Sequence, residues 1–135
     1  MKVKVPALIA SLLAFGLFAF APKALDNQDP WPVPDNYKNK ENPLKGDAAS
    51  IADGKALYTQ HCKSCHGTKG KGDGPKASQL DTECGDFTKA SFQSQTDGAL
   101  FYKTYTGRKD MPSYKTKIPD ANDIWAVVNY MRTLK

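Results

Sequence analysis

The chain has 135 residues, enough for one small domain. Its formal net charge is +5, but the first 24 residues hold three lysines and no acid, so the remainder has 16 basic against 14 acidic residues, or +2. Because nucleic-acid-binding domains are strongly basic, we expect no nucleic-acid partner. A small folded unit usually needs a disulfide, a metal or a cofactor for stability, and three cysteines cannot all pair within one chain.

Residues 1–24 have the features of an export signal. Two lysines precede an almost unbroken apolar run of 17 residues, 5–21. A basic start followed by a short apolar stretch is typical of a secretory signal peptide. The run is at the lower limit of a membrane span, so an uncleaved membrane anchor is the alternative. We therefore expect a periplasmic protein, either released or tethered to the inner membrane through residues 5–21.

Residues 25–49 are rich in proline, with Pro at positions 30, 32, 34 and 43. Proline spaced in this way favours extended polyproline II backbone and excludes helix. We interpret the segment as an extended arm or tether in front of a domain that spans 50–135. The alternative is an arm that packs Trp31 on the domain or on a partner.

The first half of the domain predicts one helix and a loop. Ser50 is a plausible N-cap, and the pattern of 51–61 predicts a helix that reaches His61 or beyond. The stretch 67–75 is too rich in glycine for regular structure. Short helical turns are expected at 76–80 and 88–92.

The second half predicts two further helices. Thr96 is expected to cap a helix over 97–106, and Gly107 to end it. The last helix is expected to start at Asp120, because apolar residues then recur at helical spacing. Those residues are Ile124, Val127, Val128, Met131 and Leu134. No alternating strand pattern is present, and the sequence predicts an all-α domain.

Cys62-Lys63-Ser64-Cys65-His66 is the C-x-x-C-H attachment sequence of c-type haem. At i and i+3 on a helical turn, the two sulfurs lie on one face, so each can form a thioether with one vinyl group of the haem. His66 then brings its imidazole under the iron from the same side. A ligand tethered in this way has a high effective concentration at the metal. The motif predicts one covalently bound haem c.

Three other interpretations compete for the motif. A thioredoxin-like redox pair requires a βαβ context, which is missing from the pattern. A zinc site requires four ligands, and the remaining candidates, Cys84 and His61, are badly placed, since His61 directly precedes Cys62. A structural disulfide between cysteines three residues apart is the third. Haem attachment is preferred over all of them.

Met111 is the best candidate for the sixth iron ligand. It stands in a polar stretch, where a methionine of the core is unexpected, and Pro112 stiffens the loop after it. A thioether ligand stabilises reduced iron. Met131, on the apolar face of the last helix, is interpreted as packing, and His61 is a less suitable rival.

These motifs, together with Gly74-Pro75 and the aromatic-rich last helix, resemble those of class I (monohaem) c-type cytochromes of the bacterial exported type. The resemblance covers residues 50–135 and implies a small cytochrome c fold, with three to five helices around one covalent haem. It implies His66 as the proximal and Met111 as the distal iron ligand. The Pro75 carbonyl is then expected to accept a hydrogen bond from the other ring nitrogen of His66. The 25–49 arm and the unassigned Cys84 depart from the family pattern.

The expected function is electron transfer rather than enzymatic catalysis. With both axial positions filled by the protein, the iron passes single electrons between respiratory or dehydrogenase partners. A haem-based sensor with a weakly held sixth ligand is the alternative. Lysines cluster within 63–76 and basic residues within 103–117, so we expect redox partners with an acidic docking surface.

Overall fold

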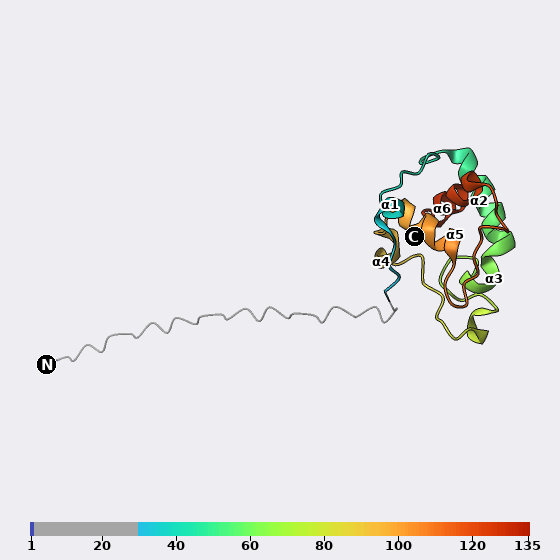
Figure 1. The fold of residues 1–135 in the computed structure, drawn as a ribbon. Coiled ribbons are helices and arrows are strands. Elements are labelled where there is room, and N and C mark those ends of the chain that lie inside the picture. The colour runs from blue at the N-terminus through green and yellow to red at the C-terminus, as the bar shows by residue number, and fades with distance from the viewer. Residues whose placement is uncertain (2–29) are drawn as a thin grey trace.

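The computed structural model describes Met1 and residues 30–135, so the predicted export segment lies outside the described residues. The described part contains six α-helices, one 3-10 helix and no strand, which confirms the all-α fold (Figure 1). Three helices are long and the others are single turns. The elements are α1 Asp35–Lys38, α2 Ala48–His61, α3 Lys63–His66, η1 Ala77–Gln79, α4 Ala90–Gln93, α5 Asp97–Thr106 and α6 Ala121–Met131.

Helices α2 and α6 cross at Gly54 and form the main packing contact of the domain (Figure 1). A Cβ atom at Gly54 would overlap the backbone carbonyl of Ala126. Only glycine therefore allows the two backbones to approach this closely. Tyr58, one turn further along α2, is almost fully buried, and its ring centroid lies 5.1 Å from that of Tyr130 on α6.

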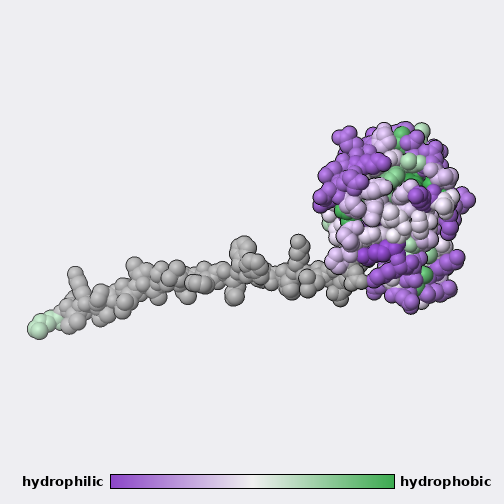
Figure 2. Space-filling view, viewed as in Figure 1, coloured by the Kyte–Doolittle hydropathy of each residue, from purple (hydrophilic) through white to green (hydrophobic). Residues whose placement is uncertain are grey.

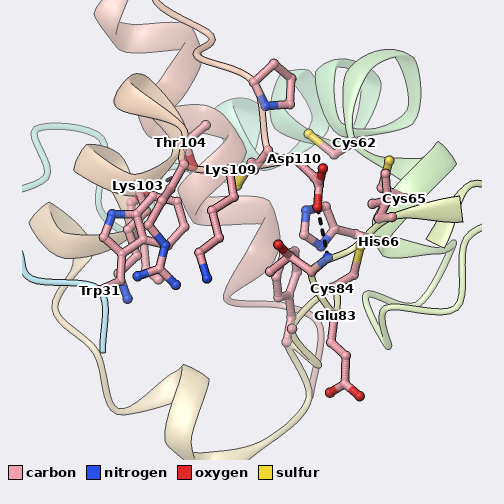
Figure 3. Close-up of a pocket in the computed structure, with 18 of the residues that line it drawn as sticks. Trp31, Cys62, Cys65, His66, Glu83, Cys84, Lys103, Thr104, Lys109 and Asp110 are labelled. Atoms are coloured by element: carbon pink, nitrogen blue, oxygen red, sulfur yellow. Dashed lines mark hydrogen bonds between the residues drawn. The ribbon is translucent and has the colours of Figure 1, made fainter. Parts of the chain in front are cut away.

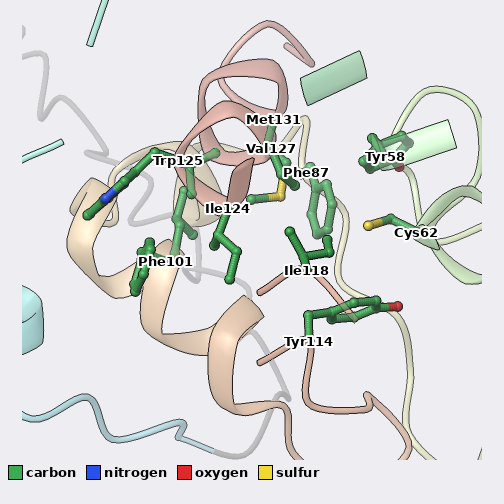
Figure 4. Close-up of a cluster of buried hydrophobic side chains, with 12 residues drawn as sticks. Tyr58, Cys62, Phe87, Phe101, Tyr114, Ile118, Ile124, Trp125, Val127 and Met131 are labelled. Carbon is green, nitrogen blue, oxygen red and sulfur yellow. The ribbon is translucent and has the colours of Figure 1, made fainter. Parts of the chain in front are cut away.

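The core joins α2, α5 and α6 to the loops between them (Figure 4). Trp125 packs on Phe101 with ring centroids 4.3 Å apart, and full burial of each large apolar side chain stabilises the fold by roughly 1.5–3 kcal/mol. Cys62 belongs to this cluster, so the first attachment cysteine is held by the core itself. The buried apolar members are Tyr58, Cys62, Phe87, Leu100, Phe101, Tyr114, Ile118, Ile124, Trp125, Val127, Val128 and Met131.

Both predicted ends of α5 and the predicted start of α6 are confirmed. The Thr96 hydroxyl accepts a hydrogen bond from the Ala99 amide at 3.2 Å, and Gly107 ends α5 with φ of +65°. The Asp120 carboxylate accepts from the Asn122 amide at 2.8 Å at the start of α6. Both caps satisfy amides that have no partner within the helix.

The start of α2 differs from the prediction. Asp47, not Ser50, caps the helix, with its carboxylate 2.9 Å from the Ala49 amide. Ser50 is buried within the first turn, where its hydroxyl donates to the Asp47 carbonyl and accepts from the Asn129 side chain on α6. Because the Ser50 hydroxyl is engaged in this long-range contact, Asp47, three residues upstream, caps the helix instead.

The tether interpretation of 25–49 is wrong for the described residues 30–49, which pack on the domain. Tyr37 lies against Tyr102 of α5, with ring centroids 4.9 Å apart, and the buried Asn42 donates to the Asn129 side chain at 2.7 Å. The segment also contains α1, although helix was not expected. Pro34 immediately precedes that turn, where proline is tolerated because the first helical amides need no helical acceptor.

None of the helices among the described residues is long and apolar enough to span a membrane. The predicted anchor, residues 5–21, is not among them.

Candidate haem-binding site

One cavity of about 430 Å³ collects the four residues predicted to hold the haem: Cys62, Cys65, His66 and Met111 (Figure 3). Cofactor sites commonly have volumes of roughly 300–1,000 Å³. The first three residues come from the end of α2 and from α3, and Met111 from the loop after α5. Met111 therefore faces the same space as residues that precede it in the sequence by 45 to 49 positions.

The attachment turn holds both cysteines in helical geometry. The amides of Cys65 and His66 both donate to the Cys62 carbonyl, at 3.1 and 2.9 Å. Three-residue spacing on such a turn directs both sulfurs to one face, and both line the cavity. No disulfide joins any of the three cysteines, Cys84 included.

His66 is held by an aromatic contact and keeps a buried nitrogen without a partner. Its ring stacks on Phe87, with centroids 4.5 Å apart, and its Nδ1 atom is buried and makes no hydrogen bond. Burial lowers the pKa of His66 to about 4, although a hydrogen bond to the Gly85 backbone opposes the shift. The imidazole is therefore neutral at pH 7, the form that binds metals.

The loop after His66 folds back over α3. The amides of Gly74 and Lys76 donate to the carbonyls of Cys65 and Ser64, at 3.1 and 2.9 Å. A Cβ atom at Gly74 would lie 2.5 Å from the Ser64 oxygen, so this return requires glycine. Pro75 lines a shallow hollow on the outer side rather than the cavity. The described contacts include no hydrogen bond between Pro75 and His66, and that contact stays a prediction.

Met111 sits at the end of a tight turn that is tied to both sides of the cavity. The backbones of Arg108 and Met111 exchange two hydrogen bonds, at 2.8 and 3.0 Å. The Asp110 carboxylate accepts from the Thr82 amide at 2.8 Å (Figure 3). Three residues after Met111, the Tyr114 hydroxyl donates to the carbonyl that directly precedes Cys62, at 2.8 Å. The turn is thus fixed relative to the attachment segment.

The interior of the cavity favours neutral groups. Burial, followed by the nearby Cys65, raises the pKa of Cys62 to about 12. Burial also raises the pKa of Tyr114 to about 12, with smaller contributions from both cysteines. Desolvation penalises charge in such surroundings, so the Cys62 thiol and the Tyr114 hydroxyl both stay protonated at pH 7. A large, mostly apolar cofactor suits this interior.

Sequence reasoning missed several residues of the cavity. Trp31, from the supposed tether, forms part of one wall, and Cys84 lines another. Lys103, Thr104 and Arg108 also face it. The only signal for Trp31 was a large aromatic residue in a polar, proline-rich segment. Met131 also lines the cavity, but it is buried in the core, as its predicted packing role requires.

The residues present fit a covalently bound haem. Two thiols on one face of a turn match the two vinyl groups of a haem. The Nδ1 atom without a hydrogen bond shows that protein contacts do not occupy both ring nitrogens of His66. A buried polar atom without a hydrogen bond calls for an explanation, and an imidazole that takes part in haem binding would supply one. Bound haem would supply one-electron redox chemistry at its iron.

Comparison with known structures supports this assignment. A complex described as the Kuenenia stuttgartiensis reducing HAO-like protein complex Kustc0457/Kustc0458 matches with a TM-score of 0.62 and 26% identity. That match covers 82% of this chain and 53% of the other, so this chain spans about half its length. The KustC0563 c-type cytochrome matches with a TM-score of 0.53 and 27% identity over 62% of this chain and 98% of that one.

Cytochrome CL of the marine bacterium Methylophaga aminisulfidivorans matches with a TM-score of 0.54 and 21% identity, over 69% of this chain and 60% of its own, which shows the fold alone. No curated protein matches the chain. The family model of cytochrome c matches residues 51–135. The chain belongs to the cytochrome c family and carries one covalently attached c-type haem.

Proposed function

We propose that the protein carries single electrons through one haem whose iron is held by His66 on one side and Met111 on the other. The observation that carries the proposal is the convergence of the attachment turn and the Met111 turn on one cavity. The protein keeps both ligands in place: Phe87 supports the imidazole, and the Arg108–Met111 turn supports the thioether. Axial thioether ligation favours reduced iron, and fixed ligands keep reorganisation small when the charge changes.

A closed iron site distinguishes a carrier from a sensor. If Met111 fills the sixth position, the reduced protein should bind carbon monoxide weakly and slowly, and the oxidised protein should show the weak long-wavelength band of methionine-ligated haem. Optical spectra of both forms, with and without carbon monoxide, measure this. Rapid, complete binding of carbon monoxide would overturn the carrier proposal and favour a haem-based sensor with a weakly held sixth ligand.

The proposed partners are redox proteins with an acidic docking surface. Lys63, Lys69 and Lys71 line a surface hollow beside the attachment turn, with Asp73 as the acid among the residues that line it. Such a patch attracts an acidic surface and raises the association rate more than the affinity. The solved relative described as part of a protein complex is in line with assembly on a larger redox partner, between respiratory or dehydrogenase components.

We place this activity in the periplasm, because cytochromes of this bacterial type are exported and the sequence begins with a basic and apolar segment. Retention on the inner membrane through residues 5–21 is the alternative. Fractionation of the native cell separates these outcomes, since a released protein appears in the soluble periplasmic fraction and an anchored one in the membrane fraction.

A further inference from the structure

The N-terminal segment supplies one wall of the haem cavity through Trp31 (Figure 3). In that view Trp31 and Lys103 lie on the opposite side of the cavity from Cys65. The Arg108 guanidinium carbon lies 4.7 Å from the centre of the Trp31 ring, and the Lys103 ammonium nitrogen lies 5.5 Å from it. Both distances fall within the roughly 6 Å range of cation–π attraction. One aromatic ring therefore faces two cations.

The two cations repel each other, and Trp31 offsets this repulsion. Burial, followed by the charge of Arg108, lowers the pKa of Lys103. The Lys103 ammonium also donates to the Gln95 side chain at 2.5 Å, and Arg108 donates to the Pro30 carbonyl at 2.8 Å. The negative face of the indole and the carbonyl just before it thus hold two like charges beside the cavity.

The segment that carries Trp31 is anchored further along the chain. The Thr96 hydroxyl donates to the Lys38 carbonyl at 2.7 Å, and the close approach of α1 to α5 requires Gly98, where a Cβ would overlap the Tyr37 carbonyl. Asn42 then fixes the chain to Asp97 at 3.1 Å. These contacts lie outside the cavity, so Trp31 is placed by its backbone and not by the cofactor.

We propose that Trp31 is a positioning residue for the redox reaction: it holds the Arg108 and Lys103 cations at the wall of the haem cavity, where they raise the reduction potential. A positive charge beside the haem disfavours the oxidised iron, which carries one more positive charge than the reduced iron. When the ring is absent, both side chains lose the aromatic face that holds them against this wall, and their charges are more exposed to screening by water. The inference rests on the proposed electron-carrier function and adds a residue from outside the minimal domain.

Spectroelectrochemical titration of the full-length, haem-loaded protein tests this role. Trp31→Leu keeps apolar cover but removes the aromatic face, and its midpoint potential should fall. We expect the equilibrium constant for one-electron reduction to drop by about threefold to tenfold, and tenfold corresponds to about 59 mV for one electron. Trp31→Phe, which retains a weaker aromatic face, should recover most of the wild-type potential.

Two controls separate positioning from packing. Val33→Ala trims a half-buried residue of the same segment that does not line the cavity, and it should leave the potential unchanged. In an Arg108→Gln background, Trp31→Leu should have a clearly smaller effect, because one of the two cations is already gone. An unchanged potential in Trp31→Leu, or an equal fall in Val33→Ala, would overturn the proposal.

The spectrum recorded in the same titration keeps this test independent of the function proposed above. If the methionine–iron band is present and the potential does not move, the role of Trp31 is wrong while the carrier proposal stands. If wild-type protein lacks that band, the ligand proposal is wrong, yet the potential difference between wild type and Trp31→Leu still decides the role of Trp31.

Discussion

Two methionines, Met111 and Met131, line the haem cavity, and their surroundings differ. Met111 is half-buried on a turn held by backbone hydrogen bonds to Arg108. Met131 is 5% exposed and packed in the core on α6. A ligand must be free to turn its sulfur toward the iron, whereas a core methionine fills space between neighbours. The two residues therefore make a matched pair for substitution.

Met111→Ala should remove the proposed distal ligand without unfolding the domain. We expect loss of the methionine–iron band, rapid carbon monoxide binding by the reduced form, and a potential lower by roughly 100 mV or more, since axial ligation sets haem potentials over about 0.8 V. Met131→Leu should keep the band and lose little stability, about 1.5 kcal/mol or less. The opposite pattern, with the band lost only in Met131→Leu, would reassign the distal ligand.

At the scale of elements, the crossing of α2 and α6 positions the attachment turn. Gly54 allows the contact, and Cys62 follows two turns later at the end of the same helix. The buried Tyr58 hydroxyl donates to the Gly67 carbonyl at 2.7 Å and so connects α2 to the loop after His66. A shift of α2 relative to α6 would move the thiols and the imidazole together.

Gly54→Ala should destabilise the protein although helix propensity predicts the reverse. Alanine in a helix is favoured over glycine by about 1 kcal/mol, but the added Cβ overlaps the Ala126 carbonyl, and overpacking of this kind costs roughly 3 kcal/mol. Urea unfolding measures the difference. Ala52→Gly, at an exposed position of the same helix, should lose only the propensity term of about 1 kcal/mol. A Gly54→Ala protein more stable than wild type would contradict the crossing.

Local signals predicted the elements where local contacts decide them. The Thr96 cap and Gly107 define α5 in sequence as in structure, because both act within one turn of the helix end. The start of α2 and the whole of α1 were missed, because both depend on distant residues: the Ser50 hydroxyl accepts from Asn129, 79 residues away, and the Lys38 carbonyl at the end of α1 accepts from Thr96, 58 residues away. No local sequence pattern indicates such contacts, and the helix α1 is too short to be stable through its intrinsic helix propensity alone.

At the scale of the whole molecule, the charged side chains are distributed unevenly over the surface. The face seen in Figure 2 is largely hydrophilic, with small separate apolar patches. The haem cavity itself is bordered by charges of both signs, with acids at Asp81, Glu83 and Asp110 as well as the cations discussed above. The lysines of the hollow beside the attachment turn, Lys63, Lys69 and Lys71, are all exposed. This hollow is the more basic surface and the proposed docking site.

Electron transfer to an acidic redox partner should slow as salt rises. The screening length falls from about 10 Å at 0.1 M to about 3 Å at 1 M ionic strength, so the steering by these lysines is lost. A triple substitution of Lys63, Lys69 and Lys71 by Glu should lower the association rate at low salt by roughly tenfold or more. A charge-matched control changes the exposed Lys38, Lys45 and Lys55 instead. Stopped-flow rates equal for both variants would exclude this docking surface.

The site was predictable to the extent that it depends on spacing. The C-x-x-C-H motif places two thiols and an imidazole by geometry alone, and the structure brings Met111 to the same cavity. Packing of Trp31 on the domain was only the alternative interpretation of the sequence, because its position follows from contacts of α1 and Asn42 with distant helices. The interpretation of 25–49 as a tether rested on proline content, which constrains the backbone but carries no information about packing.

One haem bonded to Cys62 and Cys65 is the central feature of this protein, and intact-protein mass spectrometry of natively matured material tests for it. We predict the polypeptide mass plus one haem, retained under denaturing conditions, with Cys84 as the single thiol that a maleimide reagent labels. A mass without haem, with both Cys62 and Cys65 open to labelling, would contradict the assignment.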